Sequence, residues 1–139
     1  MKIAVTLVFF LATNLLFAQS YDTLRVMSYN LLYYGEVTNF CTSTNNNIND
    51  KDGYFKTIAS YTKPDILLVN EMGANQIYAD RIIANVLNVD GETRYQRANI
   101  QNNSFSSLVN GVFYDKKKLA LHRLEKVSIA QNNSNLVRV

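Results

Sequence analysis

Hydrophobic and polar residues follow one another along the chain in a pattern that predicts strands and helices in mixed order. Residues 24–32 predict a strand, with Val26 on one face and Met27 on the other. Because both faces are mostly apolar, the pattern is typical of a strand that is covered on both sides. The polar stretch 35–52 that follows predicts a long loop.

The next segments predict two helices separated by a second strand. Apolar residues at helical spacing over 54–61 predict a short helix that ends before Pro64. Residues 66–72, I-L-L-V-N-E-M, are too short for a helix, and their four consecutive apolar residues predict a strand buried on both faces. The stripe over 75–87 predicts a second helix, with Asn75 as its N-terminal cap.

Three more extended segments are expected, at 94–99, 107–114 and 119–129, with residues 115–118 joining the last two as a hairpin. The order strand, helix, strand, helix and then strands predicts an α/β (α+β) fold with a crossover unit and antiparallel strands. A length of 139 residues, 47% hydrophobic and 18% charged, suits one globular domain and excludes a disordered or fibrous chain.

The N-terminus has the pattern of an export signal. Lys2 precedes an apolar run that reaches Ala18, which predicts a signal peptide over 1–18 and a mature chain over 19–139. The alternative is a membrane anchor, but a membrane span needs about 20 apolar residues. We therefore expect export to the periplasm or the exterior, without stable membrane insertion.

Charge and cysteine content narrow the possibilities further. The formal net charge is +3, from 14 basic and 11 acidic residues, so it gives no electrostatic reason to expect nucleic acid or an anionic membrane as partner. Cys41 is the one cysteine, so no intramolecular disulfide is available. His122 has no Asp before it, and we expect it to be structural or solvent-facing.

Two polar residues stand out because each lies near the carboxyl end of an apolar strand. Asn30 lies in the first predicted strand, although Asn is depleted in strands, and Glu71 follows the second. If the intervening helix makes a crossover, the two residues are neighbours at an edge where ligand sites form. Either Asn30 caps a turn and Glu71 pairs with a Lys or Arg at the rim, or the two face a cation.

The sequences around these residues resemble a known family. L-R-V-M-S-Y-N-L-L, with Asn30, and K-P-D-I-L-L-V-N-E-M, with Glu71, are similar to the first two motifs of the endonuclease/exonuclease/phosphatase superfamily, which includes deoxyribonuclease I. N-G-V-F-Y-D-K-K-K-L resembles the next strand pair of that family. The resemblance implies a layered β-sandwich flanked by helices, with Glu71 as a ligand of Mg²⁺ or Mn²⁺ and Asn30 as an active-site amide beside the metal.

The resemblance also has departures. Asn70 precedes Glu71 where the family has Gln, and the later family motifs, an Asp, an Asn and a closing Asp-His pair, have no counterpart before Val139. The resemblance therefore covers the N-terminal half of the family's domain. It implies a fragment of an exported metal-dependent phosphodiesterase or nuclease, acting on nucleic acid or a phospholipid headgroup. The alternative is a non-catalytic secreted binding or vestigial module that retains the half-fold.

Overall fold

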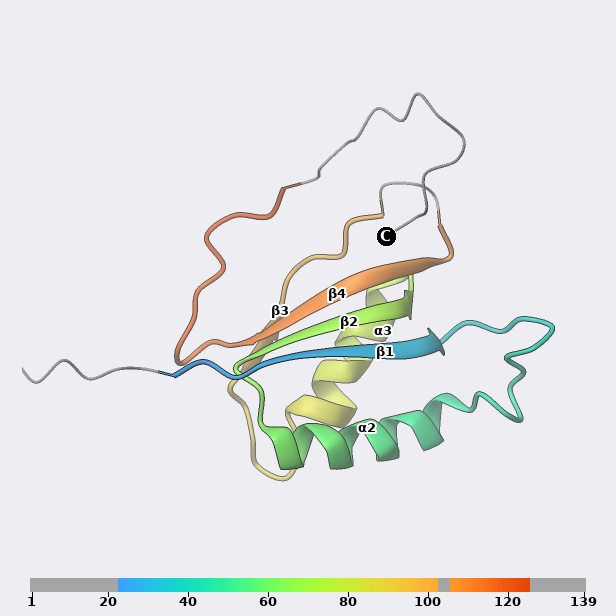
Figure 1. Ribbon diagram of the computed structural model, residues 1–139, viewed down its shortest axis with the longest axis horizontal. Helices are drawn as coiled ribbons and strands as arrows, with labels where there is room; N and C mark the ends of the chain where they lie inside the picture. Colours follow the sequence, from blue (N-terminus) through green and yellow to red (C-terminus); the bar gives the residue numbers. More distant parts are fainter. Residues whose placement is uncertain (1–22, 103–105, 126–139) are drawn as a thin grey trace, which may run out of the picture.

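Figure 1 shows the protein as a computed structural model, in which residues 23–102 and 106–125 are described. The described residues form a mixed α+β fold with one four-stranded sheet, which confirms the predicted class. The layered sandwich stays a prediction, and the predicted signal peptide lies outside the described residues. The elements are β1 (Val26–Tyr34), α2 (Ile48–Thr62), β2 (Ile66–Gly73), α3 (Gln76–Ile82), the π-helix η2 (Ile83–Leu87), β3 (Tyr95–Arg97) and β4 (Leu108–Asp115).

The sheet has the strand order β1-β2-β4-β3. Strands β1 and β2 are parallel and are connected through α2, whereas β4 is antiparallel to both β2 and β3. Figure 1 shows β1, β2 and β4 side by side, with the helices gathered on one side of the sheet. The carboxyl ends of β1 and β2 therefore lie at the same edge, as the sequence predicts.

The core lies between the sheet and the helices. Leu67 and Phe113 from the strands and Phe55 and Ile82 from the helices are almost completely buried. The ring of Tyr29 stacks on Phe55 with 5.3 Å between the centroids. Burying a side chain of this size contributes about 1.5–3 kcal/mol, so packing of the helices on this single face dominates the stability of the fold.

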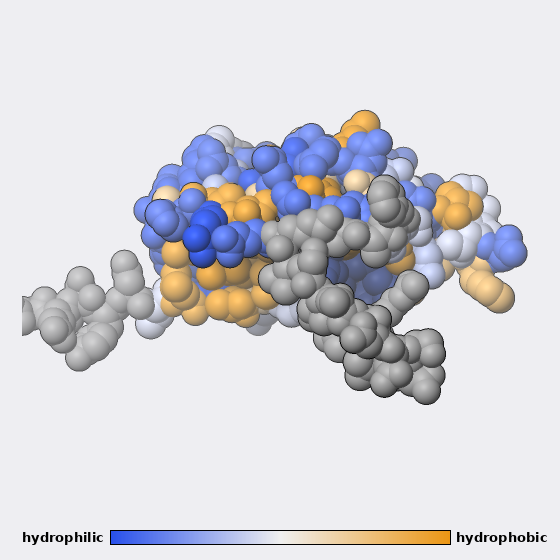
Figure 2. All heavy atoms as spheres, turned by 90° about the horizontal axis from the view of Figure 1, so that it is seen from above, coloured by the Kyte–Doolittle hydropathy of each residue, from blue (hydrophilic) through white to orange (hydrophobic). Residues whose placement is uncertain are grey.

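The opposite face of the sheet is open. Val26 is 62% exposed and Leu68 is 38% exposed, although both lie in strands that the sequence predicts to be covered on both faces. That prediction is wrong, because the described helices cover one face of these strands only. Figure 2 shows hydrophobic residues, in orange, exposed among the hydrophilic residues, in blue.

Both helices begin at an asparagine. Asn75 caps α3 through its side chain, which accepts a hydrogen bond from the backbone N–H of Ile77 at 3.1 Å, and this confirms the predicted cap. Asn47 caps α2 in the same way, accepting from Asn49 at 2.8 Å. Helix α2 therefore begins inside the stretch that the sequence predicts to be loop, because an Asn-rich segment suits a helix cap as well as a turn.

The predicted hairpin after β4 does not form within the described residues. Residues 119–125 are not a strand, and 126–129 lie outside the described ranges. Strand β4 already pairs with β2 on one side and with β3 on the other, so neither of its edges is free for a returning strand. Among the helices of the described ranges, none has the length and apolar character to cross a membrane.

Candidate functional site

The structure brings Asn30 and Glu71 together at the end of the two parallel strands. Asn30 pairs with Asn70 in the register of β1 and β2. The side-chain Nδ2 of Asn30 donates a hydrogen bond to Oε1 of Glu71 at 2.9 Å. The expected juxtaposition of the two residues is therefore confirmed, while their roles stay predictions.

An irregularity in the sheet aims Glu71 at Asn30. Between the pairs Asn30↔Asn70 and Tyr34↔Met72, β1 advances four residues while β2 advances two. Glu71 has a φ of +57°, in the left-handed region that residues other than glycine rarely adopt. In a regular strand Glu71 would face away from its neighbour Asn70, so the bulge turns the carboxylate towards Asn30. Backbone strain of this kind costs roughly 1–3 kcal/mol and clusters at functional sites.

Helix α2 supports the turn on the β1 side. Leu32 has a φ of +46°, and its backbone N–H donates to Oδ1 of Asn30 at 2.8 Å. Lys51 on α2 reaches the same turn, donating from Nζ to the carbonyl of Leu31 at 2.6 Å and also to that of Leu32. Burial lowers the pKa of Lys51, while Cys41 and Glu71 act in the opposite direction.

Asn30 and Glu71 open onto a cavity of about 490 Å³, which is lined by Asn30, Asn70, Glu71, Leu108, Val109 and Asn110. Oxygen donors of this kind suit Mg²⁺ or Mn²⁺, which take few protein ligands and retain several waters. Within the described ranges no group of three or more His, Cys, Asp or Glu side chains gathers to bind a metal. Glu71 is the single carboxylate among the residues that line this cavity.

Asn30 has a more specific place than the sequence indicates. Its Nδ2 holds Glu71 and its Oδ1 already accepts from Leu32, so both ends of the amide are engaged. The Oε2 atom of Glu71 accepts no hydrogen bond from the other described residues. In this geometry Oε2 of Glu71 is available to coordinate a cation, and Asn30 orients the Glu71 carboxylate.

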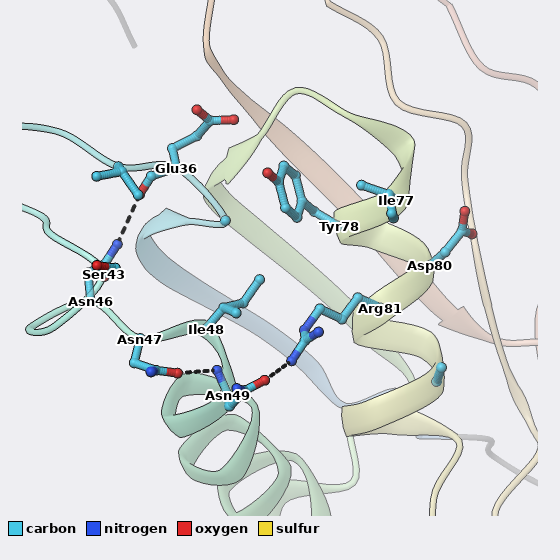
Figure 3. Close-up of a pocket in the computed structure, with 13 residues that line it drawn as sticks. Glu36, Ser43, Asn46, Asn47, Ile48, Asn49, Ile77, Tyr78, Asp80 and Arg81 are labelled. Atoms are coloured by element: carbon cyan, nitrogen blue, oxygen red, sulfur yellow. Dashed lines mark hydrogen bonds between the residues drawn. The ribbon is translucent and has the colours of Figure 1, made fainter.

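A larger cavity of about 630 Å³ lies elsewhere, between the loop after β1, the start of α2 and α3. Figure 3 shows Tyr78 and Ile48 facing this space and Arg81 reaching across to Asn49, which accepts its hydrogen bond at 2.6 Å. Neither of the two residues predicted from the sequence lines this cavity. Among its lining residues, Asn47 accepts a hydrogen bond from Asn49 and Asn46 binds the carbonyl of Glu36, while Asp80 and Arg81 form ion pairs with residues outside the cavity.

Beside this cavity lies a buried polar network that the sequence does not reveal. The hydroxyl of Tyr34 donates to Oδ1 of Asp52, while Oδ2 of Asp52 binds Arg81 at 2.6 Å and Asn85 at 3.0 Å. Burial and the hydrogen bond to Asp52 raise the pKa of Tyr34. Both oxygens of Asp52 are engaged, so this network fastens β1 and α2 to the region of α3 and η2.

The structure also locates His122 and three residues near the site that the sequence does not predict. His122 is exposed, as expected, and lies in an irregular segment. Lys51, Asn70 and Asn110 reach the site but are not predicted as its members. One available signal for Asn110 is that it is an asparagine within an otherwise apolar strand pattern.

The fold and this strand-end site define a class: a mixed α+β protein with an amide-held carboxylate at the carboxyl ends of adjacent parallel strands. Comparisons with known proteins add no relative to this description. No protein-family model, curated protein or solved structure matches the chain.

Proposed function

We propose that the protein is an exported metal-dependent phosphodiesterase or nuclease, similar to the endonuclease/exonuclease/phosphatase superfamily, and that Asn30 and Glu71 form the metal-binding part of its site. One observation carries the proposal: a carboxylate is held by an amide, in strained backbone, where two adjacent parallel strands end. The motifs around both residues resemble that superfamily, so the layered β-sandwich is part of the proposal. The proposal also includes export, which rests separately on the apolar N-terminal run.

The residues present fit a hard cation. The free Oε2 of Glu71 faces an open cavity that leaves room for waters to complete the coordination. When bound, Mg²⁺ or Mn²⁺ supplies polarisation of a phosphoryl oxygen and offsets the negative charge that develops on it. Asn30 keeps the carboxylate in place without adding a negative charge that would repel a phosphate.

The substrate class follows from the same chemistry. A phosphodiester offers anionic oxygens to a cation held at Glu71, in a cavity with room for both. Nucleic acids and phospholipid headgroups both carry this group, so we propose a phosphodiester as partner without choosing between them.

Turnover tests the proposal. Purified protein is incubated with Mg²⁺ and either supercoiled DNA or a chromogenic phosphodiester, and hydrolysis is compared between the wild type and Glu71→Gln. Because the later Asp, Asn and Asp-His motifs of the family have no counterpart in these residues, we expect only weak Mg²⁺-dependent turnover, which Glu71→Gln should lower to the background rate. The matched control is Asp90→Asn, which removes an exposed carboxylate paired with Lys56 at the surface.

The alternative is a non-catalytic secreted module that retains a metal or ligand site. It is favoured by the presence of one carboxylate in the cavity and by the absence, within the described ranges, of a larger group of metal-binding side chains. Metal binding that depends on Glu71, together with no turnover of either substrate, would support this alternative and contradict the enzyme.

A further inference from the structure

Three asparagines lie at one level of the sheet, on three adjacent strands. Asn30 on β1 pairs with Asn70 on β2. Asn110 on β4 lies between Gly111, which pairs with Val69, and Val109, which pairs with Met72, so Asn110 lies opposite the irregular step of β2 that contains Asn70 and Glu71. All three side chains are exposed, and all three line the cavity at Glu71.

This arrangement is unusual for a sheet. Asparagine is among the residues that pack worst in strands, and β1, β2 and β4 are otherwise rich in apolar side chains. Neighbouring strands lie about 4.8 Å apart, so the three amides span roughly 10 Å across the floor of the cavity. Packing gives no reason for three such residues to share one row.

The three amides differ in what they already bind. Asn30 is engaged by Glu71 and Leu32, whereas the side chains of Asn70 and Asn110 form no hydrogen bond with another residue of the described ranges. Each of these two free amides presents two N–H donors and no charge. Neutral donors beside a single carboxylate suit an anion that is bridged to that carboxylate by a cation.

We propose that Asn70 and Asn110 are substrate-positioning residues, whose side-chain amides donate hydrogen bonds to the oxygens of a phosphodiester lying next to Glu71. The inference rests on the proposed function, because without a cation Glu71 would repel the anion. It deepens that function by assigning the substrate to the β2–β4 side of the cavity, away from Lys51 on the β1 side.

Side-chain amide resonances test this assignment in the unaltered protein. The protein in Mg²⁺ is titrated with two soluble phosphodiesters, dithymidine monophosphate and glycerophosphocholine, and the side-chain NH₂ signals of asparagine are followed by NMR. We expect the signals of Asn70 and Asn110 to shift together and to saturate with at least one probe. The probe that binds more tightly shows whether a nucleotide or a lipid headgroup is the source of the phosphodiester.

Two variants refine the test. Asn110→Asp keeps the shape of the side chain but replaces donors with a negative charge, and we expect it to weaken phosphodiester binding at least tenfold, about the weight of one hydrogen bond to a charged group. Gln96→Glu is the control, since it places the same charge on the same open face, where Gln96 pairs with Tyr114 farther along β4. Gln96→Glu should bind the probes within about twofold of the wild type.

The outcomes separate this inference from the proposed function. Shifts confined to other residues, or equal binding by Asn110→Asp, would overturn the role of Asn70 and Asn110 even if Mn²⁺ binds at Glu71. Failure of Mn²⁺ to bind at Glu71 would instead overturn the proposed function, whatever the amides do. Should Asn110→Asp fail to fold, the wild-type NH₂ shifts still decide the matter.

Discussion

Two polar groups on the same strand, four residues apart, have opposite characters. Tyr34 at the end of β1 belongs to a buried network in which both oxygens of Asp52 are engaged. Asn30, earlier on the same strand, holds Glu71 in an open cavity, where one carboxylate oxygen accepts no hydrogen bond from the described residues. The first group joins elements of the fold, and the second presents a group to something outside it.

The difference shows how a functional candidate is separated from a structural one. A buried polar group must have its hydrogen bonds satisfied, so the contacts that engage both oxygens of Asp52 are explained by the stability of the fold. An oxygen left free at a bulge, on a residue forced into positive φ, gains nothing for the fold and needs another explanation. Variants in each group can break or sharpen this distinction.

The largest effect is expected in the buried network. Asp52→Ala leaves the charge of Arg81 and the hydroxyl of Tyr34 without their shared partner, and it should lower the free energy of unfolding by about 3–5 kcal/mol. Urea denaturation measures the change. Asp50→Ala, at an exposed position two residues earlier in α2, should cost less than about 1 kcal/mol. Similar losses in both variants would contradict a structural role for the network.

A smaller loss is expected when the network is reduced by one hydrogen bond. Tyr34→Phe removes the hydroxyl that donates to Asp52 and should lower the free energy of unfolding by about 1–3 kcal/mol, because a buried carboxylate oxygen loses its partner. Its neighbour Tyr33 offers the control, since Tyr33→Phe should change the stability by less than about 0.5 kcal/mol. Equal stability of Tyr34→Phe and the wild type would show that the hydroxyl is dispensable.

The opposite sign is expected at the open site. Glu71→Gly relieves the left-handed backbone and should raise the free energy of unfolding by about 1 kcal/mol, while removing the proposed metal ligand. Glu71→Ala also removes the carboxylate but keeps the strain, so it should bring no gain. If both variants destabilise the protein equally, Glu71 serves the fold rather than a ligand.

The smallest effect concerns pH and another buried carboxylate. Asp65 accepts a hydrogen bond from the backbone N–H of Arg25 at 2.8 Å and pairs with Lys118 at 3.1 Å, and these contacts lower its pKa in the folded protein. Its contribution to stability is therefore complete above the pKa of Asp in the unfolded chain, about 4, and is lost as the pH falls through the lower folded value. Unfolding free energies between pH 6 and pH 2 should fall less steeply in Asp65→Asn than in the wild type.

The sequence predicts the part of the site that depends on regular geometry. Two apolar strands joined by a helix place their carboxyl ends together, and that alone brings Asn30 and Glu71 to one edge. The bulge could not be predicted, because neither Leu32 nor Glu71 is a residue that favours positive φ. The place of Lys51 near the site could not be predicted for another reason. The start of α2 falls in an Asn-rich stretch that predicts a loop equally well.

In the fold, too, the features set by local sequence could be predicted and those set by distant contacts could not. The order of elements as far as β4 and the cap at Asn75 follow from local patterns, and both are confirmed. The pairing of β4 with β2 and β3 depends on contacts distant in sequence, and the predicted hairpin strand does not form over the described residues 119–125. Apolar runs such as 66–72 likewise predict burial without showing how many faces are covered, and Leu68 lies on the open one.

Manganese binding tests the central claim most directly. Mn²⁺ is titrated into ¹⁵N-labelled protein, and paramagnetic broadening of backbone amides is mapped for the wild type, Glu71→Gln and Asp90→Asn. We expect broadening centred on residues 30–32 and 70–72 in the wild type and in Asp90→Asn, and none there in Glu71→Gln. Equal broadening in Glu71→Gln, or broadening centred on another part of the chain, would contradict a metal site at Glu71.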